Sequence, residues 1–466
     1  MDIAVQVIGR TGNLALGVVV TLIVVRALGS SGFGEWSTIF AITQIATNFG
    51  ELGLNQVAIS RAASDPAGER DWLGALVSLR LLLAVPTTVL ALVGVVLIAP
   101  TQPVRIAGAL IAATILVGAP SAISAVFQLR VRNDITIAIM TLGSVLWGVG
   151  AFTVAVTSKS IDAFAAVFLA AAVITTGVSV VFALRLVPVR LVFSERMWRE
   201  LLRVGLGVGA AGILVTLYVK LDQVLVFEYA GSRQAGLYGA AYRILDQIQF
   251  IPISVMTTLF PLIAAAYPRD RERVHTLLQT AGEYLTMASL PALAFTVVAA
   301  HQIINLLFGS AFDEAAPALP ILMGAFVSIS FGYLAGNMVV ILELQSRFFR
   351  YAAVGLFINA TLNILLIPRY GFLAAAWITL ATEVVVMSLT MRSVLRELTT
   401  TPRFGRLLRT LMAALAMGAL TWLAQHAGVP LYGLVAVAAL SYPTLLLSLH
   451  VLSVAEVRRV LRKDPL

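Results

Sequence analysis

Polar side chains recur at helical spacing within otherwise apolar stretches of this 466-residue chain. Gln44, Asn48, Glu51 and Asn55 follow one another at intervals of four, three and four residues, so all four lie on one face of a helix. Such a stripe cannot face lipid, because a charged residue within a span costs about 2.5–3.5 kcal/mol on insertion scales. The stripe lines either a water-filled cavity or a tight contact between helices, and we favour the cavity.

Six more side chains combine positive charge or hydrogen-bonding capacity with a place inside or near an apolar stretch: Arg10, Asn13, Lys220, Gln223, Arg243 and Gln247. Arginine binds phosphate oxygens through a bidentate fork and lysine through a point charge, so the cationic members suit an anionic ligand. Alternatives stay open. Arg10 lies near the start of its stretch and can instead anchor at the membrane surface. Lys220 can pair with Asp246 in a structural ion pair. Arg243 can pair likewise with Asp222.

Three carboxylates are candidates for coupling transport to an ion gradient: Asp222, Asp246 and Glu283. Coupling requires a carboxylate whose pKa or ion affinity changes with conformation.

The chain has no cysteine and only four scattered histidines, so we expect no metal site and no cofactor. Residues 207–212 fit the pattern GxGxxG but open an apolar helix, which favours close helix packing over nucleotide binding. No GxxxxGK[ST] motif occurs, so P-loop ATP hydrolysis is excluded.

The composition requires a membrane. Hydrophobic residues make up 59% of the chain and charged residues 12%, and the mean hydropathy is +0.95. In typical soluble domains, hydrophobic residues make up roughly 45–50% and charged residues about 25%. We count fourteen windows long enough to span a bilayer, which needs about 20 apolar residues each. Connections after even-numbered windows, with the C-terminal tail, hold 23 Arg and Lys residues, whereas those after odd-numbered windows hold five. This alternation predicts that both termini are cytoplasmic, and it explains the net charge of +9 without nucleic acid.

The fold class is therefore predicted to be an all-α integral membrane protein of about fourteen transmembrane helices. A basic segment at 185–203 separates a six-helix lobe, 1–184, from a second six-helix lobe, 204–392, and we interpret this segment as lying at the membrane interface. Two further helices and a basic cytoplasmic tail occupy 393–466.

The two predicted lobes share a short repeat with an offset of 202 residues. Glycines match at Gly29 and Gly231 and again at Gly34 and Gly236, and aromatic residues match at 36 and 238. Six helices per half is an even number, so the halves would have parallel orientation and a pseudo-twofold relation. Transporters built in this way hold their substrate between the repeats and work by alternating access, with rocking of one half against the other.

Four short motifs, taken in their order along the chain, indicate the protein family more specifically. They are LGxxGFGxW at 28–36, ELGL at 51–54 followed by Arg61, AGxxxxGLYGAAYRI at 230–244 and LFGSAF at 307–312. Together they resemble the polysaccharide-biosynthesis (Wzx-type) flippases of the multidrug/oligosaccharidyl-lipid/polysaccharide (MOP) exporter superfamily, over essentially the whole chain. The resemblance implies a multi-pass protein of the cell membrane that moves a polyprenyl-pyrophosphate-linked oligosaccharide from the cytoplasmic to the outer face. It also implies contacts with membrane lipids, with polysaccharide polymerase and chain-length proteins as candidate partners.

Other functions remain as alternatives. Within the superfamily these are a lipid II-type flippase and a cation-coupled drug exporter, and the arginine-rich inventory disfavours the exporter. A membrane-embedded glycan polymerase or ligase is the alternative from another class. Such enzymes commonly need a long outer loop with acidic residues. Every predicted outer loop here is short, and the only adjacent acidic pair in these loops is Asp313-Glu314. We therefore predict a transporter and not an enzyme.

Overall fold

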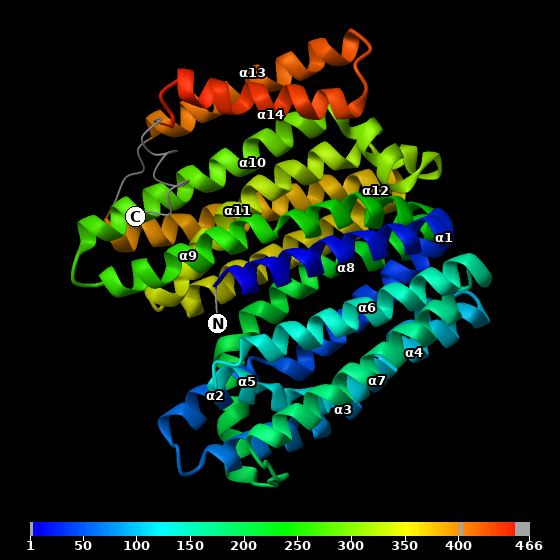
Figure 1. The fold of residues 1–466 in the computed structure, drawn as a ribbon, viewed down its shortest axis with the longest axis vertical. Coiled ribbons are helices and arrows are strands. Elements are labelled where there is room, and N and C mark those ends of the chain that lie inside the picture. The colour runs from blue at the N-terminus through cyan, green and yellow to red at the C-terminus, as the bar shows by residue number, and fades with distance from the viewer. Residues whose placement is uncertain (1–2, 400–403, 453–466) are drawn as a thin grey trace. The chain divides into compact units, whose positions relative to one another are not determined.

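The computed structural model describes residues 3–399 and 404–452, and the regular secondary structure of these residues is helical, without a strand (Figure 1). Their helices are α1 (Ile3–Glu51), α2 (Leu54–Ser64), α3 (Glu69–Ile98), α4 (Gln102–Gly118), α5 (Ala125–Leu129), α6 (Asn133–Thr157), α7 (Ile161–Leu186), α8 (Glu195–Ile248), α9 (Phe250–Ala266), α10 (Arg271–Phe308), α11 (Ala318–Ile341), α12 (Gln345–Leu398), α13 (Phe404–His426) and α14 (Leu431–Ser448), with short 3₁₀ helices η1 (Ala119–Ser124) and η2 (Ser310–Ala315). The predicted all-α membrane fold is confirmed.

Three of these helices bend sharply at a glycine. Gly29 in α1, Gly231 in α8 and Gly371 in α12 have φ of 67°, 85° and 62° with an extended ψ, a combination that is essentially confined to glycine. Eleven helical stretches in the described residues are long and apolar enough to cross a membrane, and three of them contain these kinks. Each kinked stretch exceeds 50 residues, or about 75 Å at 1.5 Å per residue, which is more than twice the bilayer core. Counting each as two crossings supports the predicted number of fourteen.

Contacts group the chain into two compact units. Unit 1 comprises residues up to Gly239 together with Ala360–Phe372, and unit 2 comprises Ala240–Asn359 together with the residues from Leu373 onward. The grouping divides α8 and α12 between the units, so the first part of α8 goes with the N-terminal helices. The predicted lobe boundaries at 184, 204 and 392 remain predictions.

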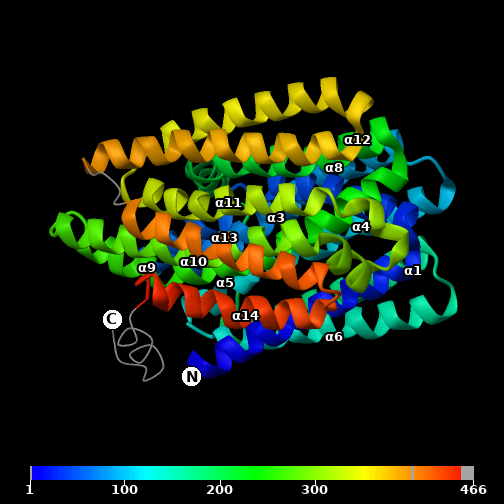
Figure 2. The same cartoon turned by 90° about the horizontal axis from the view of Figure 1, so that it is seen from above.

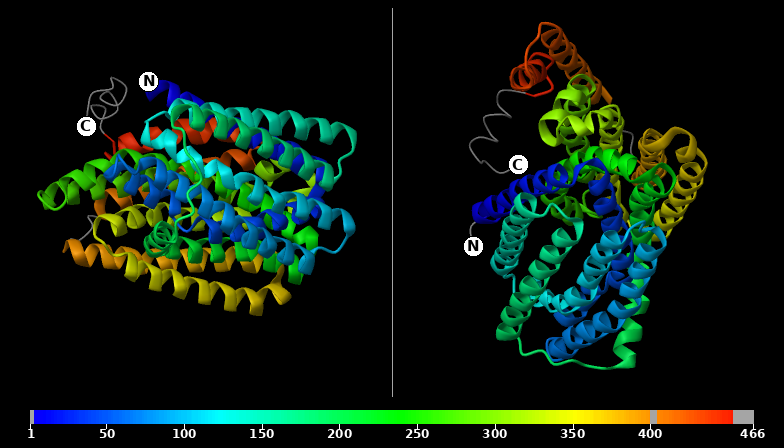
Figure 3. Two further views of the ribbon diagram at one scale, coloured as in Figure 1. Left: turned by 90° about the horizontal axis from the view of Figure 1, so that it is seen from below. Right: turned by 90° about the vertical axis from the view of Figure 1, so that its right-hand side faces the viewer.

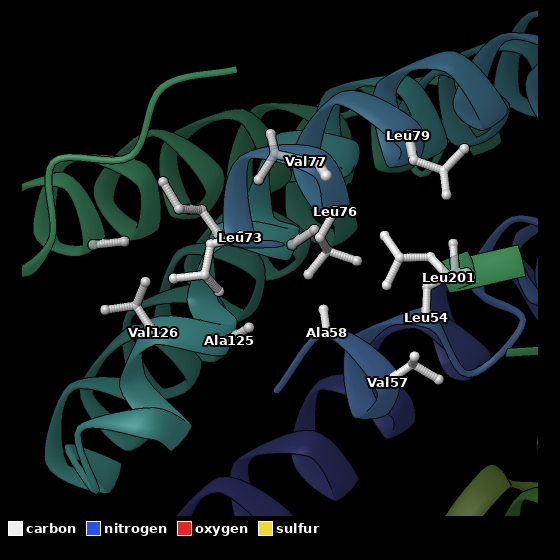
Figure 4. Close-up of a cluster of buried hydrophobic side chains, with 14 of the residues drawn as sticks. Leu54, Val57, Ala58, Leu73, Leu76, Val77, Leu79, Ala125, Val126 and Leu201 are labelled. Carbon is white, nitrogen blue, oxygen red and sulfur yellow. The ribbon is translucent and has the colours of Figure 1, made fainter. Parts of the chain in front are cut away.

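In unit 1, α4 packs against α7, and α1 packs against α3 and α6 (Figure 3, blue to green). A buried apolar cluster joins α2, α3, α5 and the start of α8, with Leu54, Leu76, Val126 and Leu201 all at most 1% exposed (Figure 4). The burial of Leu201 ties the first turns of α8 to this core.

The basic segment before α8 is held by the same core. Trp198 Nε1 donates to Ser78 Oγ at 3.0 Å and to the Ala75 carbonyl at 3.2 Å, and Ser78 Oγ donates to the Val192 carbonyl at 2.5 Å. The extended connection from α7 crosses Gly74, where any Cβ would overlap the Arg190 carbonyl. The beginning of α8 therefore packs on α3 through Trp198, and the interfacial position of this segment remains a prediction.

In unit 2, α10 packs against α9, α11 and α13, and α13 packs against α14 (Figure 2). Tyr442 of α14 donates its hydroxyl to the Met287 carbonyl of α10 at 2.9 Å. The last two helices thus attach to α10.

Candidate functional site

The two repeat turns, residues 29–34 and 231–236, contact each other within unit 1. A Cβ on Gly34 would overlap the Ser232 carbonyl, and a Cβ on Gly236 would overlap the Ser30 carbonyl. The offset of 202 residues converts the first contact into the second, because it relates Gly34 to Gly236 and Ser30 to Ser232, so the contact is reciprocal, as a local twofold axis requires. The matching conformations of Gly29 and Gly231 agree with this symmetry. The two turns lie backbone against backbone at a distance that only glycine permits.

Gln223, which the sequence places in the cavity, is instead buried next to these turns. Its side chain is 7% exposed, and its Nε2 donates to Thr38 Oγ1 at 3.3 Å and to the Ala235 carbonyl at 3.0 Å. These bonds favour a helix contact over the predicted cavity for Gln223, because its amide joins Thr38, which follows the first repeat turn, to Ala235 in the second.

Asp222 forms a buried polar site on the same part of α8. It has no exposed surface, and its carboxylate accepts hydrogen bonds from the Tyr238 hydroxyl at 3.1 Å and from Asn363 Nδ2 at 2.7 Å. Burying a carboxylate is costly unless hydrogen bonds or a cation compensate it. The hydrogen bonds from Tyr238 and Asn363 offset part of that cost, and both oxygens of the carboxylate are engaged.

The segment of α12 that carries Asn363 is itself attached to unit 1. The backbone N–H of Phe372, next to the kink at Gly371, donates to Gln234 Oε1 at 3.1 Å. Gln234 belongs to the second repeat turn. The bond positions the α12 kink beside that turn and keeps Asn363 on Asp222.

The polar stripe from Gln44 to Asn55 is interrupted. Helix α1 ends at Glu51, and Leu52 and Gly53 adopt left-handed conformations with φ of 45° and 71°, so Asn55 lies on α2. The expectation that all four side chains share one helix is therefore wrong for Asn55. Gln44 and Glu51 are exposed and Asn48 is partly exposed. Asn48 donates to the carbonyl of Gln44 at 3.0 Å.

A small pocket lies where this stripe ends. Glu51 accepts from Arg80 Nη2 at 3.1 Å, and the Arg80 side chain is only 13% exposed. The pocket has a volume of about 220 Å³ and draws its polar lining from α1, α3, α4 and η1: Thr47, Glu51, Arg80, Thr87, Thr114 and Ser121. The sequence makes Arg80 a lesser candidate for anion binding, with a surface anchor as the alternative, and it gives no signal for the hydroxyl residues, because nothing local shows that these four elements converge.

The other candidates are spread over both units. Arg10 lies outside the residues whose side chains the structure describes. Asn13 donates to Thr141 Oγ1 of α6 at 2.8 Å, so it serves at least one helix contact. Lys220 is partly buried in unit 1. In unit 2, Arg243 is exposed, and Asp246 and Gln247 are partly buried.

Glu283 is part of an ion pair that attaches α13. It is 7% exposed, and its carboxylate accepts from Gln279 Nε2 at 3.0 Å and from Arg406 Nη1 at 2.8 Å. Arg406 lies in the first turn of α13. This pairing favours a structural role over the predicted coupling role.

We expect Glu283→Ala to lower the free energy of unfolding by about 2 kcal/mol, below the 3–5 kcal/mol typical of broken buried pairs, because the Arg406 side chain is 40% exposed. Thermal unfolding in detergent measures the change. Arg347→Ala is the control, because its pair with Glu397 is nearly half exposed on both sides and should change stability by less than about 0.5 kcal/mol. A larger loss for Arg347→Ala would contradict this ranking.

The helical fold resembles the folds of known membrane transporters. The fold resembles that of the lipid II flippase MurJ in an inward closed conformation, with a TM-score of 0.73, 13% identity and 99% of both chains covered. A multidrug resistance MATE family transporter of the MOP superfamily gives a TM-score of 0.64 at 17% identity, over 83% of this chain and 94% of that one. At these identities the likeness establishes the fold.

Two curated relatives come from archaea. The "Probable flippase AglR" of Haloferax volcanii is 24% identical over 189 residues, which is 40% of each chain. An uncharacterized membrane protein of Methanocaldococcus jannaschii is 26% identical over 200 residues, 40% of this chain and 37% of that one. The matches thus span about two fifths of the relatives' lengths. The profile of the family described as "Polysaccharide biosynthesis protein" matches residues 23–317, more than half of the chain. This multi-pass membrane protein therefore belongs to the polysaccharide biosynthesis protein family, with the fold of MOP-superfamily transporters.

Proposed function

We propose that the protein is a flippase that moves a polyprenyl-pyrophosphate-linked oligosaccharide from the cytoplasmic to the outer face of the cell membrane, with both termini cytoplasmic. The observation that carries the proposal is the reciprocal contact of Gly34 with Ser232 and of Gly236 with Ser30 in a member of this family. It supports two repeats related by a local twofold axis, the architecture in which one repeat rocks against the other in alternating access. The flippase names of the relatives support the substrate class.

In this proposal each cationic side chain is a separate candidate for binding the pyrophosphate. Lys220 precedes the second repeat turn and Arg243 follows it, and Arg10 lies on the first apolar helix. Charge-assisted hydrogen bonds to phosphate are roughly twice as strong as neutral ones, which suits a group shared by all lipid-linked glycans. The neutral polar residues Asn13, Gln44, Asn48 and Gln247 would contact the sugar part.

We expect Lys220→Ala or Arg243→Ala to reduce flipping at least tenfold while the protein still inserts and purifies normally, because a hydrogen bond to a charged group contributes about 1.5–3 kcal/mol. The measurement is transfer of a fluorescent polyprenyl-pyrophosphate glycan across liposomes that contain the purified protein. Arg199→Ala is the control, because this arginine is highly exposed at the start of α8 and pairs with Glu195. Unchanged flipping in both cavity variants would contradict the pyrophosphate assignment.

The same assay separates the alternatives. Liposomes that hold lipid II, or a cationic drug in place of the glycan lipid, test the two other transport functions. A chain that elongates or transfers the glycan without moving it would indicate the polymerase or ligase. Association with polymerase and chain-length proteins remains a proposal that co-purification from membranes can test.

A further inference from the structure

The pocket beside Glu51 has walls that accept hydrogen bonds. Each lining hydroxyl already donates its proton to its own helix: Thr47 to the Thr43 carbonyl, Thr87 to Leu83, Thr114 to Ile111 and Ser121 to Gly118, at 2.5–2.8 Å. A hydroxyl has one proton and two lone pairs, so these four oxygens present acceptors to the pocket. A ligand there needs donors of its own.

The net charge of the lining excludes an ionic ligand. The Glu51 carboxylate is balanced by Arg80 at 3.1 Å, and the other polar lining groups are neutral. A bare cation would need oxygens at about 2.0–2.6 Å on several sides, and a cavity of about 220 Å³ is too wide for that. An anion would meet four acceptor oxygens and a carboxylate. A neutral ligand is the one that fits.

The volume of the pocket and the N–H donors of Arg80 further limit the class of ligand that fits. At about 30 Å³ per water, the cavity holds about seven waters, less than the roughly 300 Å³ at which drug-sized sites begin. Arg80 brings five N–H donors, and Nη2 is the one that contacts Glu51. A ligand whose hydroxyls both donate and accept matches this mixture.

The backbone around the pocket agrees with a polar occupant. Helix α1 ends at Glu51 before two left-handed residues, α3 contains Pro86, and α4 passes into the 3₁₀ helix η1 at Ala119. Irregular backbone at membrane depth is tolerated where it is buried in protein or lines a water-filled cavity. The end of α1 at Glu51 and the change to η1 at Ala119 both lie in the pocket lining.

We infer that the Glu51–Arg80 pocket is a subsite for one neutral sugar ring of the transported glycan. The inference rests on the proposed function and deepens it, because it separates sugar recognition from pyrophosphate recognition. The hydroxyl oxygens and Glu51 accept from the sugar hydroxyls, and Arg80 donates to sugar oxygens.

The first test is a pair of binding measurements on purified protein. The probes are polyprenyl pyrophosphate bearing one hexose and the same carrier without sugar. Thr114→Val with Ser121→Ala should weaken binding of the glycosylated carrier about 10- to 30-fold, from the loss of two hydrogen bonds, and leave the bare carrier unaffected. The control is Thr88→Val, which lies next to Thr87 on α3 but outside the lining, and should change neither affinity. Equal loss for both carriers, or no loss, overturns the inference.

A second test does not depend on transport or on the lipid. The chain contains no cysteine, so Ser121→Cys introduces a single thiol in the pocket, and Ser60→Cys introduces one on exposed α2. Methyl hexosides at millimolar concentration should slow maleimide labelling at position 121 and not at position 60. Absence of protection overturns the subsite. If the wild-type protein binds neither carrier, the proposed function fails, and this labelling result still decides whether the pocket binds sugar.

Discussion

Replacing Gly236 with alanine is expected to abolish transport and to lower the free energy of unfolding by about 3 kcal/mol. The added Cβ would overlap the Ser30 carbonyl and lie close to the backbone of Gly34, so the two repeat turns must separate. Overpacking usually costs about 1–3 kcal/mol, and the upper end applies because the neighbour is backbone and cannot change rotamer. Tryptophan fluorescence during thermal unfolding in detergent measures stability, and the liposome assay measures transport.

The twofold relation supplies a second variant and a control for this prediction. Gly34→Ala should have the same effect, because its Cβ would overlap the Ser232 carbonyl. Gly177→Ala in α7 has no atom within 4 Å of the new Cβ and should leave stability unchanged or raise it by up to about 1 kcal/mol. Normal stability of both turn variants would show that the turns are not held together in the folded protein.

Replacing Asp222 with asparagine is expected to leave a folded protein whose transport no longer responds to an ion gradient. Asparagine has nearly the same shape and keeps one oxygen for the Tyr238 hydroxyl or for Asn363 Nδ2, at 3.1 and 2.7 Å in the native protein. It cannot gain or lose a proton and binds cations more weakly than a carboxylate. Flipping in liposomes with imposed proton and sodium gradients measures the effect.

Two companion variants separate coupling from stability at this site. Asp222→Ala should destabilise the protein by about 1–3 kcal/mol for each buried donor that loses its acceptor. Tyr238→Phe removes one donor and keeps the carboxylate, so it should retain the gradient response. Full gradient response in Asp222→Asn would exclude this carboxylate as the coupling group and leave Asp246 and Glu283 to be tested in the same way.

The candidate residues differ in whether the structure places their side chains in helix contacts. Asp222 was predicted as a coupling candidate, and its side chain is fully buried with hydrogen bonds from Tyr238 and Asn363. Gln223 and Asn13 were assigned to the cavity, but their side chains make defined helix contacts. A polar residue in a span must avoid lipid, and both a cavity and a helix contact satisfy that requirement, so spacing alone cannot choose between them.

The sequence by itself determined the local features of this protein. Hydropathy indicated the membrane and the apolar stretches, and the glycines at 29 and 231 marked where the helices bend, because that backbone conformation is almost exclusive to glycine. These rules act on neighbouring residues and need no knowledge of the fold. The repeat with its offset of 202 residues is likewise visible in one dimension.

Only the tertiary structure decided which distant residues meet. Arg80 pairs with Glu51 across 29 residues, Arg406 with Glu283 across 123, and Asn363 with Asp222 across 141. Every arginine or asparagine in a span offers the same donors, and no spacing rule selects one acceptor among many. The partner is fixed by helix packing, in which close glycine contacts such as that of Gly34 with Ser232 set how near two backbones come. The Glu51–Arg80 pocket and the buried carboxylate site are consequences of that packing.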